Sequence, residues 1–149
     1  MSEIRLERFR KMDPNRVHSF LYEFKRWAST ESQIHAVALI GSHARGNPTE
    51  ESDVDLIILI ALPNIYLEFK QWLSLFGDVV RDQREEYGPC TSLRVWYRDG
   101  LEVEFGFCET SWAGQPMEEG TREVISGGMK VLFERTPILS PLLVEDSVR

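Results

Sequence analysis

The sequence predicts an α+β fold: a single domain over residues 1–149 with a mixed β-sheet and helices packed mainly on one face. Two apolar runs of strand length, 34–40 and 54–61, flank a segment rich in turn residues. Before the first run, apolar residues recur at helical spacing up to about residue 29. Downstream, Asp99-Gly100 joins the runs 91–98 and 101–108, as in a two-residue β-hairpin.

Capping residues, proline and glycine mark the ends of several predicted helices and strands. Asp13-Pro14 is an N-cap followed by proline at the first helical position, so it predicts the start of the first helix. Pro63 begins a predicted second helix that Gly77 ends. Its expected apolar face consists of Ile65, Phe69, Trp72, Leu73 and Phe76. The pattern further predicts a strand over 79–86, a short helix over 121–125 and a last strand over 129–134.

Length and composition limit the class of protein. The chain has 149 residues, of which 42% are hydrophobic and 28% charged, as expected of one globular domain. No apolar run reaches the roughly 20 residues that span a bilayer, and the N-terminus lacks the apolar core of a signal peptide. We therefore expect a cytoplasmic protein without a membrane partner. Cys90 and Cys108 have no metal-like spacing; reduced thiols are the expectation and a disulfide is the alternative.

The net charge of -7 bears on the partner. Proteins that grip long nucleic acids carry basic surfaces that displace counterions, so bulk DNA or RNA is disfavoured as a substrate. Acidic charge near a site would suit a cationic acceptor, although net charge mainly reports solubility.

The segment 39–59 carries the chemistry. Gly41-Ser42 follows the first strand, and ten residues later the second strand begins with Asp53-Val54-Asp55. Alternate side chains of a strand share a face, so the two carboxylates project together and repel unless a cation lies between them. Carboxylate oxygens select Mg²⁺ or Mn²⁺. The backbone N–H groups of the Gly41 turn can cradle an anion, and the combination indicates phosphoryl or nucleotidyl transfer. The alternative is a surface turn before a strand with a solvated acidic start.

The string 41–46, Gly-Ser-His-Ala-Arg-Gly, followed by Ser-Asp-Val-Asp-Leu at 52–56, resembles the polymerase-β-type nucleotidyltransferase superfamily. It is similar to the minimal nucleotidyltransferases and the antibiotic adenylyltransferases. The resemblance implies metal ligation by Asp53 and Asp55 and a nucleoside triphosphate as co-substrate, with ATP expected. It also implies transfer of a nucleoside monophosphate, AMP, to a hydroxyl with release of pyrophosphate.

Two further residues of this string are candidates for nucleotide binding beside Gly41. The Ser42 hydroxyl can donate to a phosphate oxygen, and the Arg45 guanidinium can neutralise phosphate charge. The alternatives are a helix N-cap for Ser42 and a solvated surface charge for Arg45.

Nucleotidyl transfer calls for a third acid on a neighbouring strand, as metal ligand and as the general base for the acceptor hydroxyl. The strand after Asp99-Gly100 offers Glu102 and Glu104 on one face. In related antibiotic nucleotidyltransferases the third acid follows a hairpin glycine at about this distance, which favours Glu104. Those relatives often carry aspartate there, and the longer glutamate leaves chemistry with one metal ion open.

The acceptor is not readable from the sequence. Relatives usually carry a second domain that shapes the acceptor site, and only about forty residues follow Cys108. One hypothesis is an enzyme acting on a small molecule or a protein hydroxyl, completing its site as a homo-oligomer. Another is an antitoxin-type minimal nucleotidyltransferase paired with a helical toxin. A third is a catalytically inert nucleotide-binding module.

Overall fold

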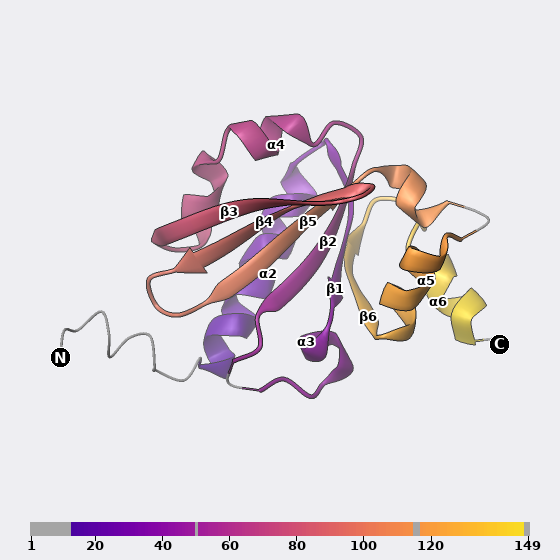
Figure 1. The fold of residues 1–149 in the computed structure, drawn as a ribbon, viewed down its shortest axis with the longest axis horizontal. Helices are drawn as coiled ribbons and strands as arrows, with labels where there is room; N and C mark the ends of the chain where they lie inside the picture. The colour runs from indigo at the N-terminus through magenta and orange to yellow at the C-terminus, as the bar shows by residue number, and fades with distance from the viewer. Residues whose placement is uncertain (1–12, 50, 115–116, 148–149) are drawn as a thin grey trace.

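A six-stranded mixed sheet forms the centre of the fold (Figure 1). This computed structural model describes residues 13–49, 51–114 and 117–147. The strand order is β3-β4-β5-β2-β1-β6; β2 and β5 run parallel, and every other neighbouring pair is antiparallel. The strands are β1 (Ile34–Ile40), β2 (Val54–Ile60), β3 (Val79–Tyr87), β4 (Cys90–Tyr97), β5 (Glu102–Cys108) and β6 (Met129–Glu134). The predicted α+β class with a mixed sheet is confirmed.

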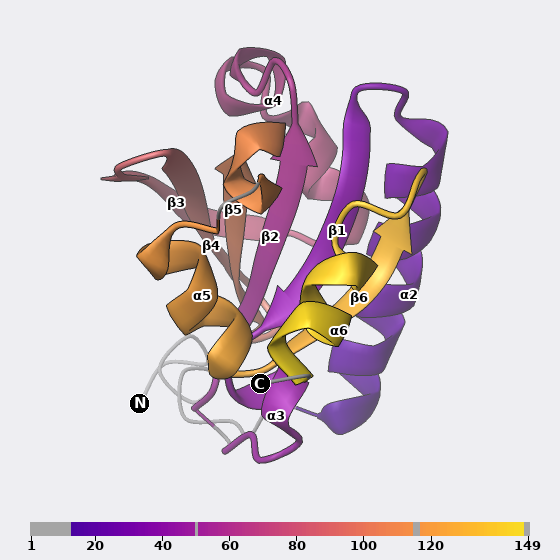
Figure 2. The ribbon, with the colours of Figure 1, turned by 90° about the vertical axis from the view of Figure 1, so that its right-hand side faces the viewer.

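Helices lie on both faces of this sheet, with the longest on one of them (Figure 2). The first face carries α2 (Pro14–Thr30), α4 (Asn64–Glu68) and the 3-10 helix η1 (Gln71–Phe76). The second face carries the 3-10 helix η2 (Thr110–Ala113), α5 (Glu119–Ser126) and α6 (Ser140–Ser147). The short α3 (Ser42–Arg45) follows β1 at one end of the sheet. As predicted, the Asp13 carboxylate caps α2, accepting a hydrogen bond from the Asn15 N–H.

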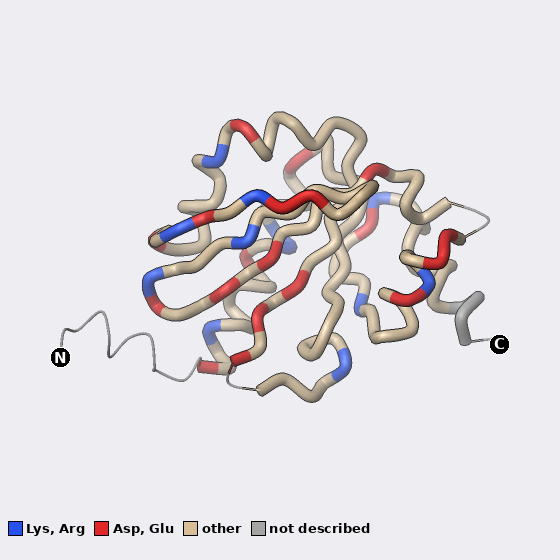
Figure 3. The backbone as a smooth tube through the Cα atoms, viewed as in Figure 1, with Lys and Arg blue, Asp and Glu red and all other residues tan. Residues whose placement is uncertain are grey.

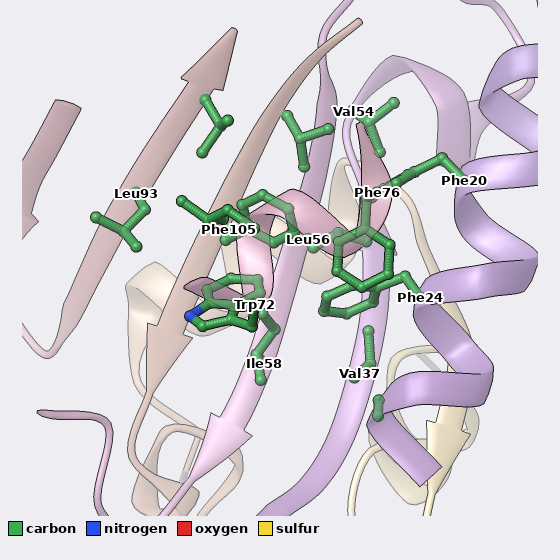
Figure 4. Packing of buried hydrophobic residues seen from close by; sticks show 14 of the residues in the cluster. Phe20, Phe24, Val37, Val54, Leu56, Ile58, Trp72, Phe76, Leu93 and Phe105 are labelled. Carbon is green, nitrogen blue, oxygen red and sulfur yellow. The ribbon is translucent and has the colours of Figure 1, made fainter. Parts of the chain in front are cut away.

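The main core lies between α2 and the first face of the sheet (Figure 4). Phe20 and Phe24 are one helical turn apart on α2, so both point inward onto Phe105 of β5. Trp72 of η1 meets the same Phe105 ring edge-on, with centroids 5.0 Å apart. All four rings are at least nine-tenths buried, so they form a closely packed layer between α2, η1 and the sheet.

The second face has a smaller core at one end only. Along β2 the side chains of Leu56 and Ile58 enter the main core, whereas Ile57 and Leu59 enter the smaller one. Helices η2, α5 and α6 cover this far end, with Trp112, Ile125 and Leu142 buried beneath them. The opposite end of the same face, where β2 and β5 begin, carries acidic residues instead.

The predicted helix from Pro63 to Phe76 was wrong as one continuous element. Phe69 adopts an extended conformation (φ −103°, ψ 95°) that separates α4 from η1. Because this break shifts the helical phase, α4 buries Tyr66 and Leu67 and leaves the side chains of Ile65 and Phe69 more than half exposed. In η1 the Trp72 indole donates to the Tyr66 carbonyl at 2.9 Å, which secures the break.

The two cysteines also differ from the expectation. Cys90 of β4 lies directly opposite Cys108 of β5, with Cα atoms 4.4 Å apart, and the two sulfurs form a disulfide. That Cα separation is within the range that a disulfide spans. Strand register, which cysteine spacing does not reveal, brings the pair together.

Two wider expectations concern the whole chain. Of the helices among the described residues, none is both long and apolar enough to cross a bilayer. The single domain over 1–149 stays a prediction, because residues 1–12 and three shorter stretches lie outside the described residues.

Candidate active site

Three carboxylates converge at the end of the second face where β2 and β5 begin. Asp55 is the second residue of β2 and shares a face with Ile57, while the parallel register pairs it with Glu104 of β5. Asp53 lies immediately before β2. One carboxylate oxygen from each of Asp53, Asp55 and Glu104 lies within 4.8 Å of the other two. Figure 3 shows the acidic positions of β2 and β5 side by side. These are the three acids that the sequence singled out; the structure brings them together, and their roles stay predictions.

The carboxyl group of Asp55 is partly buried and lies beside two other acids. Burial raises the pKa of its carboxyl to about 7, and the Asp53 charge and the hydrogen bond and charge of Glu104 act in the same direction. The Arg94 charge opposes them. Asp55 Oδ1 is buried and has no hydrogen-bond partner among the described residues. A buried oxygen without a donor is costly, and a cation would relieve that cost together with the repulsion between the acids.

Two constraints require glycine at position 41, next to Asp55. Its backbone has φ 78° and ψ −158°, a region essentially restricted to glycine. A Cβ there would stand 2.7 Å from Asp55 Oδ2. The backbone turn from β1 into α3 therefore runs directly beside the carboxylate cluster. The alternative interpretation, a generic surface turn, does not account for that approach.

The other two nucleotide-binding candidates lie on α3. Gly41, not Ser42, occupies the N-cap position, and Ser42 is the first residue of the helix. The Arg45 guanidinium donates through Nη1 to the Gly127 carbonyl at 3.0 Å. Arg45 therefore ties α3 to the turn between α5 and β6, a contact that sequence reasoning did not foresee.

A cation that the sequence left unassigned sits among the acids. Arg94 of β4 lies opposite Glu104 in the register and donates to Asp53 at 3.0 Å and to Glu104 at 3.2 Å. It also donates to Glu102 at 2.8 Å and to Glu85 at 3.3 Å. Glu102 thus contacts Arg94 and lies outside the group of three acids. The alternation of side chains along β4 does not by itself show that Arg94 faces the acids. The register between β4 and β5 shows it.

A cavity of about 510 Å³ opens beside the acids on the second face. Its lining includes Asp55 of β2 together with Glu104 and Gly106 of β5. The segment after Cys108 supplies further lining residues, including Trp112 of η2 and Thr121 of α5. Trp112 is 7% exposed, so it is a packed aromatic and also lines the cavity. Residues of η2 and α5 therefore complete the wall of a pocket within one chain.

The comparisons with known proteins agree with this geometry. The nucleotidyltransferase domain family matches residues 21–104, more than half of the chain. That span runs from α2 to Glu104 and includes the Gly41 turn and all three acids.

One relative in sequence and one protein of similar fold give the resemblance more detail. A curated protein of Methanocaldococcus jannaschii, named provisionally as a protein adenylyltransferase, is 34% identical over 59 residues, which is 40% of this chain and 58% of the relative. An aminoglycoside 6-adenyltransferase from Bacillus subtilis has a similar fold, with a TM-score of 0.52 and 17% identity over 68% of this chain. The chain spans only 37% of that structure's length. On its family match, this chain belongs to the polymerase-β-type nucleotidyltransferase domain family.

Proposed function

We propose that this protein is a metal-dependent nucleotidyltransferase that moves AMP from ATP to a hydroxyl group and releases pyrophosphate. The observation that carries the proposal is the convergence of Asp53, Asp55 and Glu104 beside the Gly41 turn. The family match and the adenylyl-transferring relatives support the choice of reaction and of ATP.

The residues present fit a divalent cation. The unpartnered Asp55 Oδ1 and the mutual repulsion of three acids are the features that Mg²⁺ or Mn²⁺ would satisfy. Asp53, Asp55 and Glu104 would hold the ion, which would supply charge stabilisation for the triphosphate and acidify the attacking hydroxyl.

Other residues of the chain would bind the phosphates, and Glu104 would transfer the proton. Gly41 and Ser42 would place backbone N–H groups and a hydroxyl against the phosphates, with Arg45 adding positive charge at the edge of the site. Glu104 would accept the proton of the acceptor hydroxyl. The hydroxyl oxygen would attack the α-phosphorus, and the bond from that phosphorus to pyrophosphate would break.

The cavity supports an acceptor with one reactive group inserted beside Glu104. Asp55 and Glu104 line the cavity and Asp53 does not, so the acceptor would approach from the β5 side. No Lys or Arg occurs among the described lining residues, whereas Asp55, Glu104 and Glu118 do. A neutral or cationic acceptor is favoured over an anionic one, because Glu118 lies outside the proposed metal site and would repel an anion. A volume of about 510 Å³ admits a small molecule or one protein side chain.

Radiolabelled nucleoside triphosphates test this function. With Mg²⁺ and α-labelled ATP, label should pass to an acceptor in a cell extract and pyrophosphate should appear, and the other three triphosphates should serve less well. Gel electrophoresis and thin-layer chromatography of the products separate a protein acceptor, such as a toxin partner, from a small molecule. The variant with both Asp53→Asn and Asp55→Asn should keep its fold and lose metal-dependent ATP binding in calorimetry. Unaltered binding in that variant would refute the proposal.

A further inference from the structure

Arg94 shares its guanidinium between two kinds of carboxylate. Two of its four acidic partners, Asp53 and Glu104, belong to the proposed metal site. The other two, Glu102 and Glu85, do not. One side chain therefore bridges the proposed site and a second acidic pair next to it.

The bridge conflicts with cation binding. A carboxylate oxygen that accepts a hydrogen bond from a guanidinium has a lone pair engaged, and the positive charge of Arg94 opposes a second cation nearby. The Arg94 side chain is 25% exposed, so water screens this repulsion only in part. At the same time Arg94 offsets the repulsion between Asp53 and Glu104, which would otherwise crowd each other.

We infer that Arg94 is a positioning residue that acts as an internal counterion: it holds Asp53 and Glu104 together, and it shifts onto Glu102 and Glu85 when a divalent cation binds. This inference rests on the proposed function. It assigns Glu102 the role of retaining Arg94 and leaves metal ligation to Glu104.

The surroundings of Arg94 allow such a shift. Its Nε already donates to Glu85 and its Nη1 to Glu102, so the guanidinium keeps two charged partners after it leaves the other two. Glu85 is on the edge strand β3 and Glu102 is at the start of β5. Both lie on β-strands adjacent to β4, so no backbone movement is needed to keep them within reach.

Mn²⁺ titration without nucleotide, read by the electron paramagnetic resonance signal of free Mn²⁺, tests the inference directly. Arg94→Gln should raise Mn²⁺ affinity by about tenfold or more, because it removes a competing charge and frees two ligands. Arg94→Lys, which keeps the charge and loses the forked geometry, should fall between Arg94→Gln and the wild type. Arg84→Gln is the matched control, since Arg84 pairs with Glu86 outside the site, and it should leave the affinity unchanged.

A double-mutant cycle with Glu102→Gln separates the two possible roles of Glu102. Alone, this variant should weaken Mn²⁺ binding several-fold, because Arg94 would then be held more firmly by Asp53 and Glu104. In the Arg94→Gln background the same change should have little effect. An equal loss in both backgrounds would make Glu102 a direct ligand and overturn the assignment, as would an unchanged or weaker affinity in Arg94→Gln. Failure of both the wild type and Arg94→Gln to bind Mn²⁺ would instead refute the metal site and the proposed function with it.

Discussion

Replacing Gly41 with alanine tests the contact that joins the β1–α3 turn to the acid cluster. The substitution imposes two costs. The backbone conformation, φ 78° and ψ −158°, should cost about 1–3 kcal/mol for a residue with a Cβ. The new Cβ would also stand 2.7 Å from Asp55 Oδ2, so the carboxylate has to move. We expect a total loss of about 2–4 kcal/mol in the free energy of unfolding, since overpacking in a confined site adds about 1–3 kcal/mol and the carboxylate can relieve part of it by moving.

Gly46→Ala is the matched control. Gly46 has the same φ of 78°, in the left-handed helical region, and no atom of the described residues lies within 4 Å of an added Cβ. Its loss should be about 1–2 kcal/mol, the ordinary cost of that backbone region for an L-residue. The difference between the two variants isolates the collision with Asp55 and the stricter backbone requirement at Gly41.

Urea unfolding with EDTA present measures the stability of both variants, and Mn²⁺ titration measures the effect on the proposed site. Gly41→Ala should bind Mn²⁺ less tightly because Asp55 is displaced, whereas Gly46→Ala should bind it as the wild type does. Equal stability losses in the two variants, together with wild-type Mn²⁺ affinity in Gly41→Ala, would refute this account of Gly41.

Three further predictions concern the acid cluster, the disulfide and the core. Because the pKa of Asp55 is raised from 3.8 to about 7, the folded chain binds more protons than the unfolded chain between these values. The free energy of unfolding without metal should therefore fall as pH rises through that window, and Asp55→Asn should flatten the trend in urea titrations at each pH. Reducing the Cys90–Cys108 disulfide, which spans 18 residues, should cost about 3 kcal/mol, and the double serine variant should lose the same amount and no longer respond to reductant. Phe105→Ala should cost about 3–5 kcal/mol because that ring is fully buried, and Phe69→Ala, at a position 62% exposed, should change stability by no more than about 0.5 kcal/mol. A Phe69→Ala loss as large as that of Phe105→Ala would contradict the observed break between α4 and η1.

The local sequence pattern was sufficient to predict most of the helices and strands. The start of α2 at Pro14 follows from the Asp13 cap, and β1 and β6 occur over the predicted ranges, because each signal depends on a few neighbouring residues. The spacing of Gly41 to Asp53 and Asp55 likewise identified the family, since a turn between two strands fixes which side chains meet. The helix predicted from Pro63 failed because the extended conformation at Phe69 is imposed by packing of Trp72 and Tyr66, not by local propensity.

The tertiary structure decided which distant residues face one another. Strand alternation puts Glu102 and Glu104 on one face, and the spacing from Gly100 favoured Glu104 only through a resemblance to relatives. The parallel register of β2 with β5 is what pairs Glu104 with Asp55. The same is true of Cys90 and Cys108, and of Arg94 among its acids. Strand register and direction are set by the burial of side chains across the whole sheet, so no single segment encodes them. Short sequence segments therefore determined which residues form the site. The packing of the two cores on either side of the sheet determined how those residues are arranged.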